Sequence, residues 1–175
     1  MRSLVITIVG PERPGVVRLL SDTAQRHGAN WSDSVLATFA SQFAGVVHLQ
    51  VPHERSDALQ AALQALDSQD LHVQLAWADG PAPAPAVRRM ALELVGHDRP
   101  GIIHSIASEL SALQVSIDRM KTHIASGAMS GEQMFHLQAQ LTVPQTLEPG
   151  QLQAALESLA NELMVDLSTV PLEGA

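Results

Sequence analysis

The sequence predicts an α+β protein made of two copies of one small domain, each with the element order β-α-β-β-α-β. The first observation is a repeat: IVGPERPGV at residues 8–16 returns as LVGHDRPGI at residues 94–102, an offset of 86 residues. Three shorter matches follow in the same order, at offsets of 88, 93 and 92 residues: HLQ at 48–50 and 136–138, LQAAL at 59–63 and 152–156, and LHVQL at 71–75 with LMVDL at 163–167. A repeat of about 80 residues is too long for a solenoid and has the size of a small domain.

The second observation is the stretch DGPAPAPAV at residues 79–87, which lies between the two copies. Alternating proline and alanine favours an extended, fairly stiff connector. The sequence therefore predicts a first domain at residues 1–79, a linker at residues 80–87 and a second domain at residues 88–172.

Hydrophobic periodicity predicts the first elements of the first copy. Residues 3–9 are apolar and β-branched, which is typical of a buried strand. Pro14 lies near the predicted start of a helix, where proline is well tolerated. Apolar residues then recur every three to four positions as far as His27, and Gly28 follows in a C-capping position.

The rest of the first copy is predicted in the same way. Apolar residues alternate along residues 30–39 and 43–51, which indicates a hairpin that turns at residues 40–42. Trp31, Val35, Ala37 and Phe39 stand on alternate positions of the first hairpin strand, as residues of one face would, and only Asp33 breaks this pattern. A helical stripe at residues 59–66 and an alternating strand at residues 71–77 complete the copy.

The second copy is expected to repeat this order. Its elements are a strand at 90–96, a helix at 102–113, a hairpin of 115–125 with 133–143, a helix near 151–161 and a strand at 163–170. Two right-handed βα units of this kind place both helices on one face of an antiparallel four-stranded sheet. This is the split-βαβ, or ferredoxin-like, architecture.

The other face of such a sheet is left open. The first strand is apolar on both sides, with Leu4, Ile6 and Ile8 on one and Val5 and Val9 on the other. We therefore expect the open face or an edge to be covered by the other copy or by a second chain. The alternative is a central strand that stays partly exposed.

Composition narrows the classes of function. Eighteen acidic against ten basic residues give a net charge of -8, which disfavours direct binding of nucleic-acid phosphates. The chain has no cysteine, so disulfides, thiolate metal sites and cysteine nucleophiles are excluded. No apolar run approaches the roughly 20 residues of a membrane span, and no signal-peptide pattern opens the chain, so we expect a cytoplasmic protein.

The eight histidines do not form a pair at metal-ligand spacing on a predicted element, so we expect no metal and no cofactor. His48 and His136 both fall on the third strand of their copy and are interpreted as one shared structural position.

The loop after the first strand is the candidate binding site. It contains Glu12, Arg13, Pro14, Gly15 and Val16 in the first copy, and Asp98, Arg99, Pro100, Gly101 and Ile102 in the second. The helix that follows offers unpaired N–H groups and a partial positive charge, which suit a carboxylate. The acid before the arginine would hold an ammonium, so the pair of groups fits a free amino acid. The alternative is a turn that only starts a helix.

These residues carry a resemblance. The doubled β-α-β-β-α-β pattern, with ERPGV and DRPGI after the first strands, resembles the ACT domain, a small-molecule regulatory module. The tandem, acidic layout is similar to the glycine cleavage system transcriptional repressor family. The resemblance implies that the ligand is held by the residue before Arg-Pro-Gly and by a polar residue 18 positions later. These residues are Glu12 with Asn30, and Asp98 with Ser116. It also implies that a neighbouring module supplies the opposite wall.

The function implied is a non-enzymatic regulator that binds a small amino acid, glycine among the candidates. It would act on transcription through a DNA-binding protein partner and would assemble as a homo-oligomer. Two alternatives stay open. One is an assembly module that binds no ligand. The other is a small hydrolase like the acylphosphatases, with Arg18 and Asn30 as the anion-binding pair, where the second copy has His104 and Ser116.

Overall fold

The chain divides into two units, Met1–Ala82 (unit 1) and Pro83–Ala175 (unit 2). The structure, a computed structural model, describes residues 1–78, 86–126 and 132–172. The expected linker at residues 80–87 lies outside the described residues as far as residue 85, and Val87 already begins a strand.

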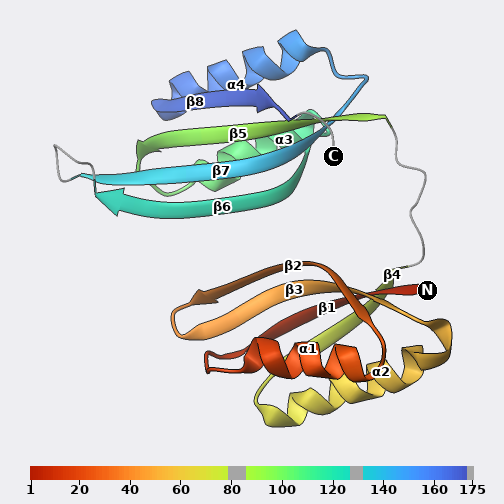
Figure 1. Cartoon of the computed structure of the whole chain (residues 1–175). Coiled ribbons are helices and arrows are strands. Elements are labelled where there is room, and N and C mark those ends of the chain that lie inside the picture. The colour runs from red at the N-terminus through yellow and green to blue at the C-terminus, as the bar shows by residue number, and fades with distance from the viewer. Residues whose placement is uncertain (79–85, 127–131, 173–175) are drawn as a thin grey trace. The chain divides into compact units, whose positions relative to one another are not determined.

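Unit 1 contains one antiparallel sheet with the strand order β2-β3-β1-β4 and two helices on one of its faces (Figure 1). Its elements are β1 Arg2–Pro11, α1 Val16–Arg26, β2 Asn30–Phe39, β3 Gln42–Val51, α2 Ser56–Gln64 and β4 His72–Ala78, with short 3-10 turns at His53–Arg55 and Ala65–Gln69.

Unit 2 has the same topology, with the strand order β6-β7-β5-β8 (Figure 1). Its elements are β5 Val87–His97, α3 Ile102–Ala112, β6 Ser116–Ser126, β7 Gln133–Pro144, α4 Pro149–Leu163 and β8 Val165–Pro171. The predicted α+β architecture, two ferredoxin-like units of order β-α-β-β-α-β, is confirmed.

Each unit buries an aliphatic core between its sheet and its helices. Alternate residues of β1 and the inner stripes of α1 and α2 meet there, and Leu4, Ile6, Leu20 and Leu59 are at most 1% exposed. A fully buried side chain of this kind contributes about 1.5–3 kcal/mol. The predicted strands and helices form because their apolar periods match this single buried surface.

Strand β2 differs from its prediction at one point. A bulge between Trp31 and Asp33 shifts the register by one residue. Trp31 therefore packs against the core, whereas Val35 and Phe39 lie on the open face, 50% and 71% exposed. The prediction that these aromatic and apolar residues share a face is wrong for Trp31, because alternation fails across a bulge.

The strand registers also show which residues of the two units correspond. Gly10 pairs with Phe43 in unit 1, and Gly96 pairs with Phe135 in unit 2. Since the two glycines stand one residue before the end of equivalent strands, β3 and β7 correspond at an offset of 92 residues, not 88.

The extra length lies in the second hairpin. Eight residues join the paired Ala125 and Met134, whereas two join the paired Phe39 and Gln42. The offset therefore rises from 86 to 92 residues at this hairpin, and by a further two residues before the last strand. The unequal offsets of the short sequence matches did not show where the extra residues lie.

Two sequence matches are corrected by these registers. His48 lies opposite Val5, and His136 lies opposite Val95, so the two histidines do not share a structural position. Likewise, LHVQL and LMVDL are offset by 92 residues in sequence, but Val73 and Leu167 correspond at an offset of 94.

No helix among the described residues combines the length and the apolar character needed to cross a membrane.

Candidate functional site

The loop between the first strand and the first helix has the same backbone geometry in both units. Gly15 immediately precedes α1 with φ 98° and ψ -1°, and Gly101 precedes α3 with φ 97° and ψ -9°. A Cβ added at either glycine would meet no atom within 4 Å. Glycine is therefore required here by its left-handed backbone, not by a close approach of other atoms.

The helices that follow start without a side-chain cap. Neither α1 nor α3 has a side-chain hydrogen bond at its N-terminus or an acidic residue in its first turn. The first N–H groups of an α-helix lack intrahelical partners and carry a partial positive charge. An anionic group placed against Val16 or Ile102 would therefore find hydrogen-bond donors.

In unit 1 the acid of the loop is held by its own chain. The Thr38 hydroxyl donates to Oε2 of Glu12 at 2.8 Å, and the Glu12 N–H donates to the carbonyl of Ser41 at 3.0 Å. An open pocket of about 260 Å³ lies beside the loop. It is lined by Glu12, Arg13, Pro14, Gly15, Val16, Val17, Arg18 and Phe43.

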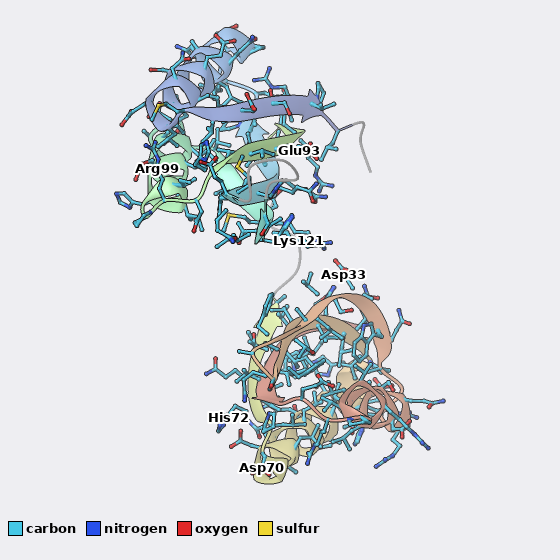
Figure 2. The ribbon with its side chains drawn as sticks, turned by 90° about the vertical axis from the view of Figure 1, so that its left-hand side faces the viewer. Asp33, Asp70, His72, Glu93, Arg99 and Lys121 are labelled. Carbon is cyan, nitrogen blue, oxygen red and sulfur yellow. The ribbon has the colours of Figure 1, made fainter. Side chains whose placement is uncertain are left out.

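In unit 2 the backbone contact recurs but the side-chain contact does not. The Asp98 N–H donates to the carbonyl of Gln133 at 3.0 Å, while its carboxylate has no partner among the described residues. Arg99, beside the start of α3 in Figure 2, donates from Nη2 to the carbonyl of Glu162 at 3.3 Å. The Asp98 carboxylate is therefore the more available acceptor of the two loops.

Asn30 does not lie near the loop of its own unit. On β3, Gln42 pairs with Pro11, which adjoins Glu12, whereas Gln50 pairs with Asn30. Positions eight residues apart on a strand are separated by about 26 Å. Glu12 and Asn30 can therefore share a ligand only if they come from different modules.

Ser116 has the same placement in unit 2. It pairs with Thr142 of β7, whereas His97, next to Asp98, pairs with Met134. The structure thus groups the predicted loop residues within each unit but leaves the second-strand residue at the far end of the sheet.

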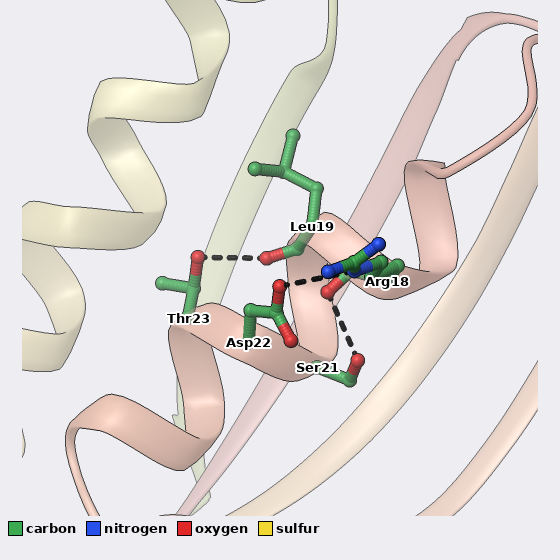
Figure 3. A network of polar contacts seen from close by, with 5 residues as sticks. All are labelled: Arg18, Leu19, Ser21, Asp22 and Thr23. Carbon is green, nitrogen blue, oxygen red and sulfur yellow. Dashed lines mark hydrogen bonds and ion pairs between the residues drawn. The ribbon is translucent and has the colours of Figure 1, made fainter.

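The anion-binding pair of the hydrolase alternative is not assembled. Arg18 lies in the first turn of α1, and Asn30 follows the far end of that helix. The Arg18 side chain is 84% exposed and pairs with Asp22 at 3.5 Å on the helix surface (Figure 3). In the same network Ser21 donates to the carbonyl of Arg18 and Thr23 donates to that of Leu19. These contacts lie within α1 and do not form an anion loop.

One histidine pair was missed by sequence spacing. His123 and His136 stack across β6 and β7, with ring centroids 4.7 Å apart and planes at 9°. Their separation in sequence does not indicate this contact, because the two histidines become neighbours only through the register of β6 and β7. In the part of the chain that the structure describes, no three His, Asp or Glu residues are grouped as metal ligands would be.

Comparison with known proteins supports the fold throughout the chain. A structure of an unknown protein from Galdieria sulphuraria superposes with a TM-score of 0.81 at 22% identity, covering 98% of this chain and 99% of that one. A second structure, of a "putative glycine cleavage system transcriptional repressor", gives a TM-score of 0.71 at 20% identity, covering 99% and 98%. No match was found among curated proteins.

The family of the chain is shown by one family model that matches it twice. Residues 2–76 and residues 89–169 each match the family model described as ACT domain. Both matches coincide with the β-α-β-β-α-β units described above. The chain therefore belongs to the ACT domain family, and it contains two ACT domains in tandem.

Proposed function

We propose that this chain is a non-enzymatic, cytoplasmic regulator whose ACT domains bind a small amino acid, with glycine the first candidate. It would act on transcription through a DNA-binding protein partner, as a homo-oligomer. The observation that carries the proposal is the doubled loop, with a carboxylate directly before Arg-Pro-Gly and an uncapped helix directly after it.

The loop offers complementary groups for the two charges of an amino acid. The ligand carboxylate would accept hydrogen bonds from the first N–H groups of α1 or α3. Its ammonium would contact Glu12 or Asp98. Because the Glu12 carboxylate already accepts a hydrogen bond from Thr38, we propose Asp98 and the α3 loop as the stronger site.

The far wall of each site would come from a neighbouring module. Asn30 and Ser116 begin the second strands of their units, about 26 Å along the sheet from the loops. A second module could place such a residue over the loop. Ligand binding would then favour one packing of the modules over another, which is how a ligand shifts an equilibrium between assemblies.

The acidic charge supports a protein partner as the contact to DNA. At a net charge of -8, the chain as a whole repels a phosphate backbone, which disfavours direct binding to DNA. The link to glycine cleavage rests on the resemblance of the sequence layout and on the likeness in fold to the structure described as such a repressor.

Calorimetric titration of the full chain with glycine, serine, alanine and the other standard amino acids tests ligand binding. We expect saturable binding of a small amino acid. Asp98→Asn should weaken it at least about tenfold, because an ammonium loses a charged acceptor. Glu54→Gln, which removes an equal charge from the turn at His53–Arg55, should leave it unchanged. Silence from all twenty amino acids would defeat the proposal.

A gel-shift experiment tests the partner. The purified chain is mixed at low salt with promoter DNA of the glycine cleavage genes, where electrostatic binding is strongest. We expect no sequence-dependent shift from the chain alone. Tight, sequence-dependent binding would refute regulation through a partner.

A second candidate, an assembly module without a ligand, is favoured by the open face of unit 1. Val9, Val35, Phe39 and Val46 are 40%, 50%, 71% and 44% exposed. Contiguous apolar surface of this kind marks interaction sites. Analytical ultracentrifugation should show a mass that falls for Val35→Lys with Val46→Lys, and not for Gln64→Lys on α2. Assembly together with calorimetric silence would favour this candidate over sensing.

A further inference from the structure

The two units differ at one end of their cores, where the first strand begins and the last strand ends. Arg2 and Arg88 correspond at the offset of 86 residues that relates the first strands. Leu4 pairs with Trp77 in unit 1, and its counterpart Met90 pairs with Pro171 in unit 2. Trp77 and Pro171 therefore occupy equivalent positions.

The nearby helices also correspond residue by residue. The LQAAL match relates α2 to α4 at an offset of 93 residues, and its leucines Leu59 and Leu152 are both buried. Ser56 therefore corresponds to Pro149, and Gln60 corresponds to Gln153.

In unit 1 an indole fills the space between these elements. The Trp77 ring lies under the guanidinium of Arg2, whose Cζ is 3.9 Å from the ring centroid. The indole Nε1 donates to Oε1 of Gln60 at 2.8 Å, and Nη1 of Arg2 donates to the Ser56 hydroxyl at 3.2 Å. The ring thus has a cation on its face and an acceptor at its polar edge.

In unit 2 the arginine remains but its partners have changed. Pro171 replaces the aromatic ring, and Pro149 replaces the hydroxyl. Gln153 donates instead to Glu157 at 2.8 Å. Arg88 donates from Nη2 to the carbonyl of Leu147, and its buried Nε has no hydrogen-bond partner among the described residues.

A pocket lies at this place in unit 2. Its volume is about 650 Å³, within the usual range of small-molecule sites. It is lined by Val87, Arg88, Arg89, Met90, Pro149, Leu152, Gln153, Thr169, Pro171 and Leu172. Its walls are mainly apolar. Of the two arginines in this lining, Arg88 shares the core face of β5 with Met90, whereas the exposed side chain of Arg89 alternates to the other face of the sheet.

The helix beside the pocket adds to its positive character. α4 has 15 residues, starts with Pro149 next to its N-cap Glu148, and has neither a side-chain cap nor an acid in its first turn. Its N-terminal partial charge therefore has the same sign as the guanidinium of Arg88. An anionic group is the complement of this surface, and an ammonium would be repelled.

We propose that unit 2 binds a small aromatic carboxylate in the pocket between β5, β8 and the first turn of α4. The aromatic ring takes the place that the indole of Trp77 takes in unit 1. The carboxylate faces the guanidinium group of Arg88, which matches it as a planar fork. This site is independent of the proposed amino-acid loops, since Gly101 follows the opposite end of β5.

The test is a titration of the ¹⁵N-labelled full chain, followed by amide NMR. The probes are indole-3-acetate and benzoate, with tryptophan and uncharged indole as comparisons. We expect saturable shifts at Arg88, Gln153, Thr169 and Leu172, with indole-3-acetate binding more tightly than tryptophan or indole. No saturable shift with either carboxylate, or equal binding of tryptophan, would overturn the proposal.

Two variants locate the site. Pro171→Trp lets the chain fill the pocket with its own indole, as unit 1 does, and should abolish binding. The matched control Val170→Trp places the same ring at the neighbouring exposed position on the other side of β8 and should leave binding unchanged. Unchanged binding by Pro171→Trp would contradict the assignment.

A third variant keeps the test decisive if the tryptophan disturbs folding. Arg88→Met retains length and apolar contact but removes the charge. It should weaken indole-3-acetate at least about tenfold, and uncharged indole, which loses only a cation at its ring face, much less. Equal weakening of both probes would show that Arg88 only supports the fold, and would remove the carboxylate from the proposal.

Discussion

The two ACT domains share one topology, but different side chains close the end of each core. Unit 1 closes the end of its core with Trp77, which Arg2 and Gln60 hold from two sides. Unit 2 keeps the arginine as Arg88 and has Pro171 in place of the ring. One copy of a duplicated fold can therefore contain the cation without the aromatic partner that it has in the other copy, and the cation is then available to contact another group.

The open faces of the two sheets also differ, one being apolar and the other charged. Val35, Val46 and Phe39 make the face of unit 1 apolar. On unit 2, Glu93 of β5 and Lys121 of β6 carry charge on the sheet (Figure 2), and Gln138 donates to Glu93 at 3.1 Å. The apolar face is suited to association and the charged face to solvent, so the expected covering of an open face applies to unit 1 above all.

The largest effect should come from removing the indole ring of Trp77, the side chain by which this end of the unit 1 core differs from that of unit 2. Trp77→Ala should destabilise unit 1 by about 3 kcal/mol, because a large side chain packed on the core leaves a cavity. Urea unfolding checks this, with Trp31 as the remaining tryptophan in unit 1 and in the chain. Pro171→Ala in unit 2 is the matched control and should cost far less. Equal losses would show that Trp77 adds nothing beyond its strand position.

The next largest effect is expected at Gly10 and Gly96, which stand one residue before the ends of β1 and β5. A Cβ at Gly10 would lie 2.5 Å from the backbone carbonyl oxygen of Asp70, whereas one at Gly96 would lie 2.3 Å from Cγ1 of Val165. A backbone atom cannot turn aside as a side chain can. Gly10→Ala should therefore cost about 2–3 kcal/mol and Gly96→Ala about 1 kcal/mol. Urea midpoints in the reverse order would contradict the comparison, and Gly150→Ala, with no atom within 4 Å, controls for the alanine itself.

A smaller and equal effect is expected at the two loops. Gly15→Ala and Gly101→Ala should each cost about 1 kcal/mol, because an L side chain is disfavoured in the left-handed region and no clash adds to that cost. Thermal unfolding of both variants measures the difference. A much larger loss in one unit would show that its loop is strained in a way the other is not.

These comparisons also show what the sequence could predict. The fold was predictable because buried leucines and valines recur at the periods of strands and helices, and because the RPG loop marks the same junction twice. The pairing of His123 with His136 was not predictable, since it depends on the longer second hairpin. The pocket was hidden for a related reason: Pro171 is recognised as the counterpart of Trp77 only after the strand registers are known.

The candidate loop was predictable as a group, but not the difference between its two copies. The residues from Glu12 to Val16 are adjacent in sequence, so their proximity required no tertiary information. The hydrogen bond from Thr38 to Glu12 did require it, because Thr38 reaches the loop across the sheet. Asn30 and Ser116 were named only through the resemblance to ACT domains, and the strand registers place both residues far from the loops of their own units.

The smallest effect on stability is expected from removing the hydrogen bond between Thr38 and Glu12. The same variant tests whether the two loops differ in their affinity for an amino acid. Thr38→Val removes the hydroxyl that donates to Glu12, and should cost at most about 0.5 kcal/mol because the bond is exposed. Its counterpart in unit 2 is Ile124, which offers no hydroxyl to Asp98. If amino-acid binding follows the availability of the carboxylate, Thr38→Val should raise the affinity of the first loop and Ile124→Thr should lower that of the second. Calorimetry with the same amino acid measures both changes, and opposite signs are required because one variant frees a carboxylate while the other engages one.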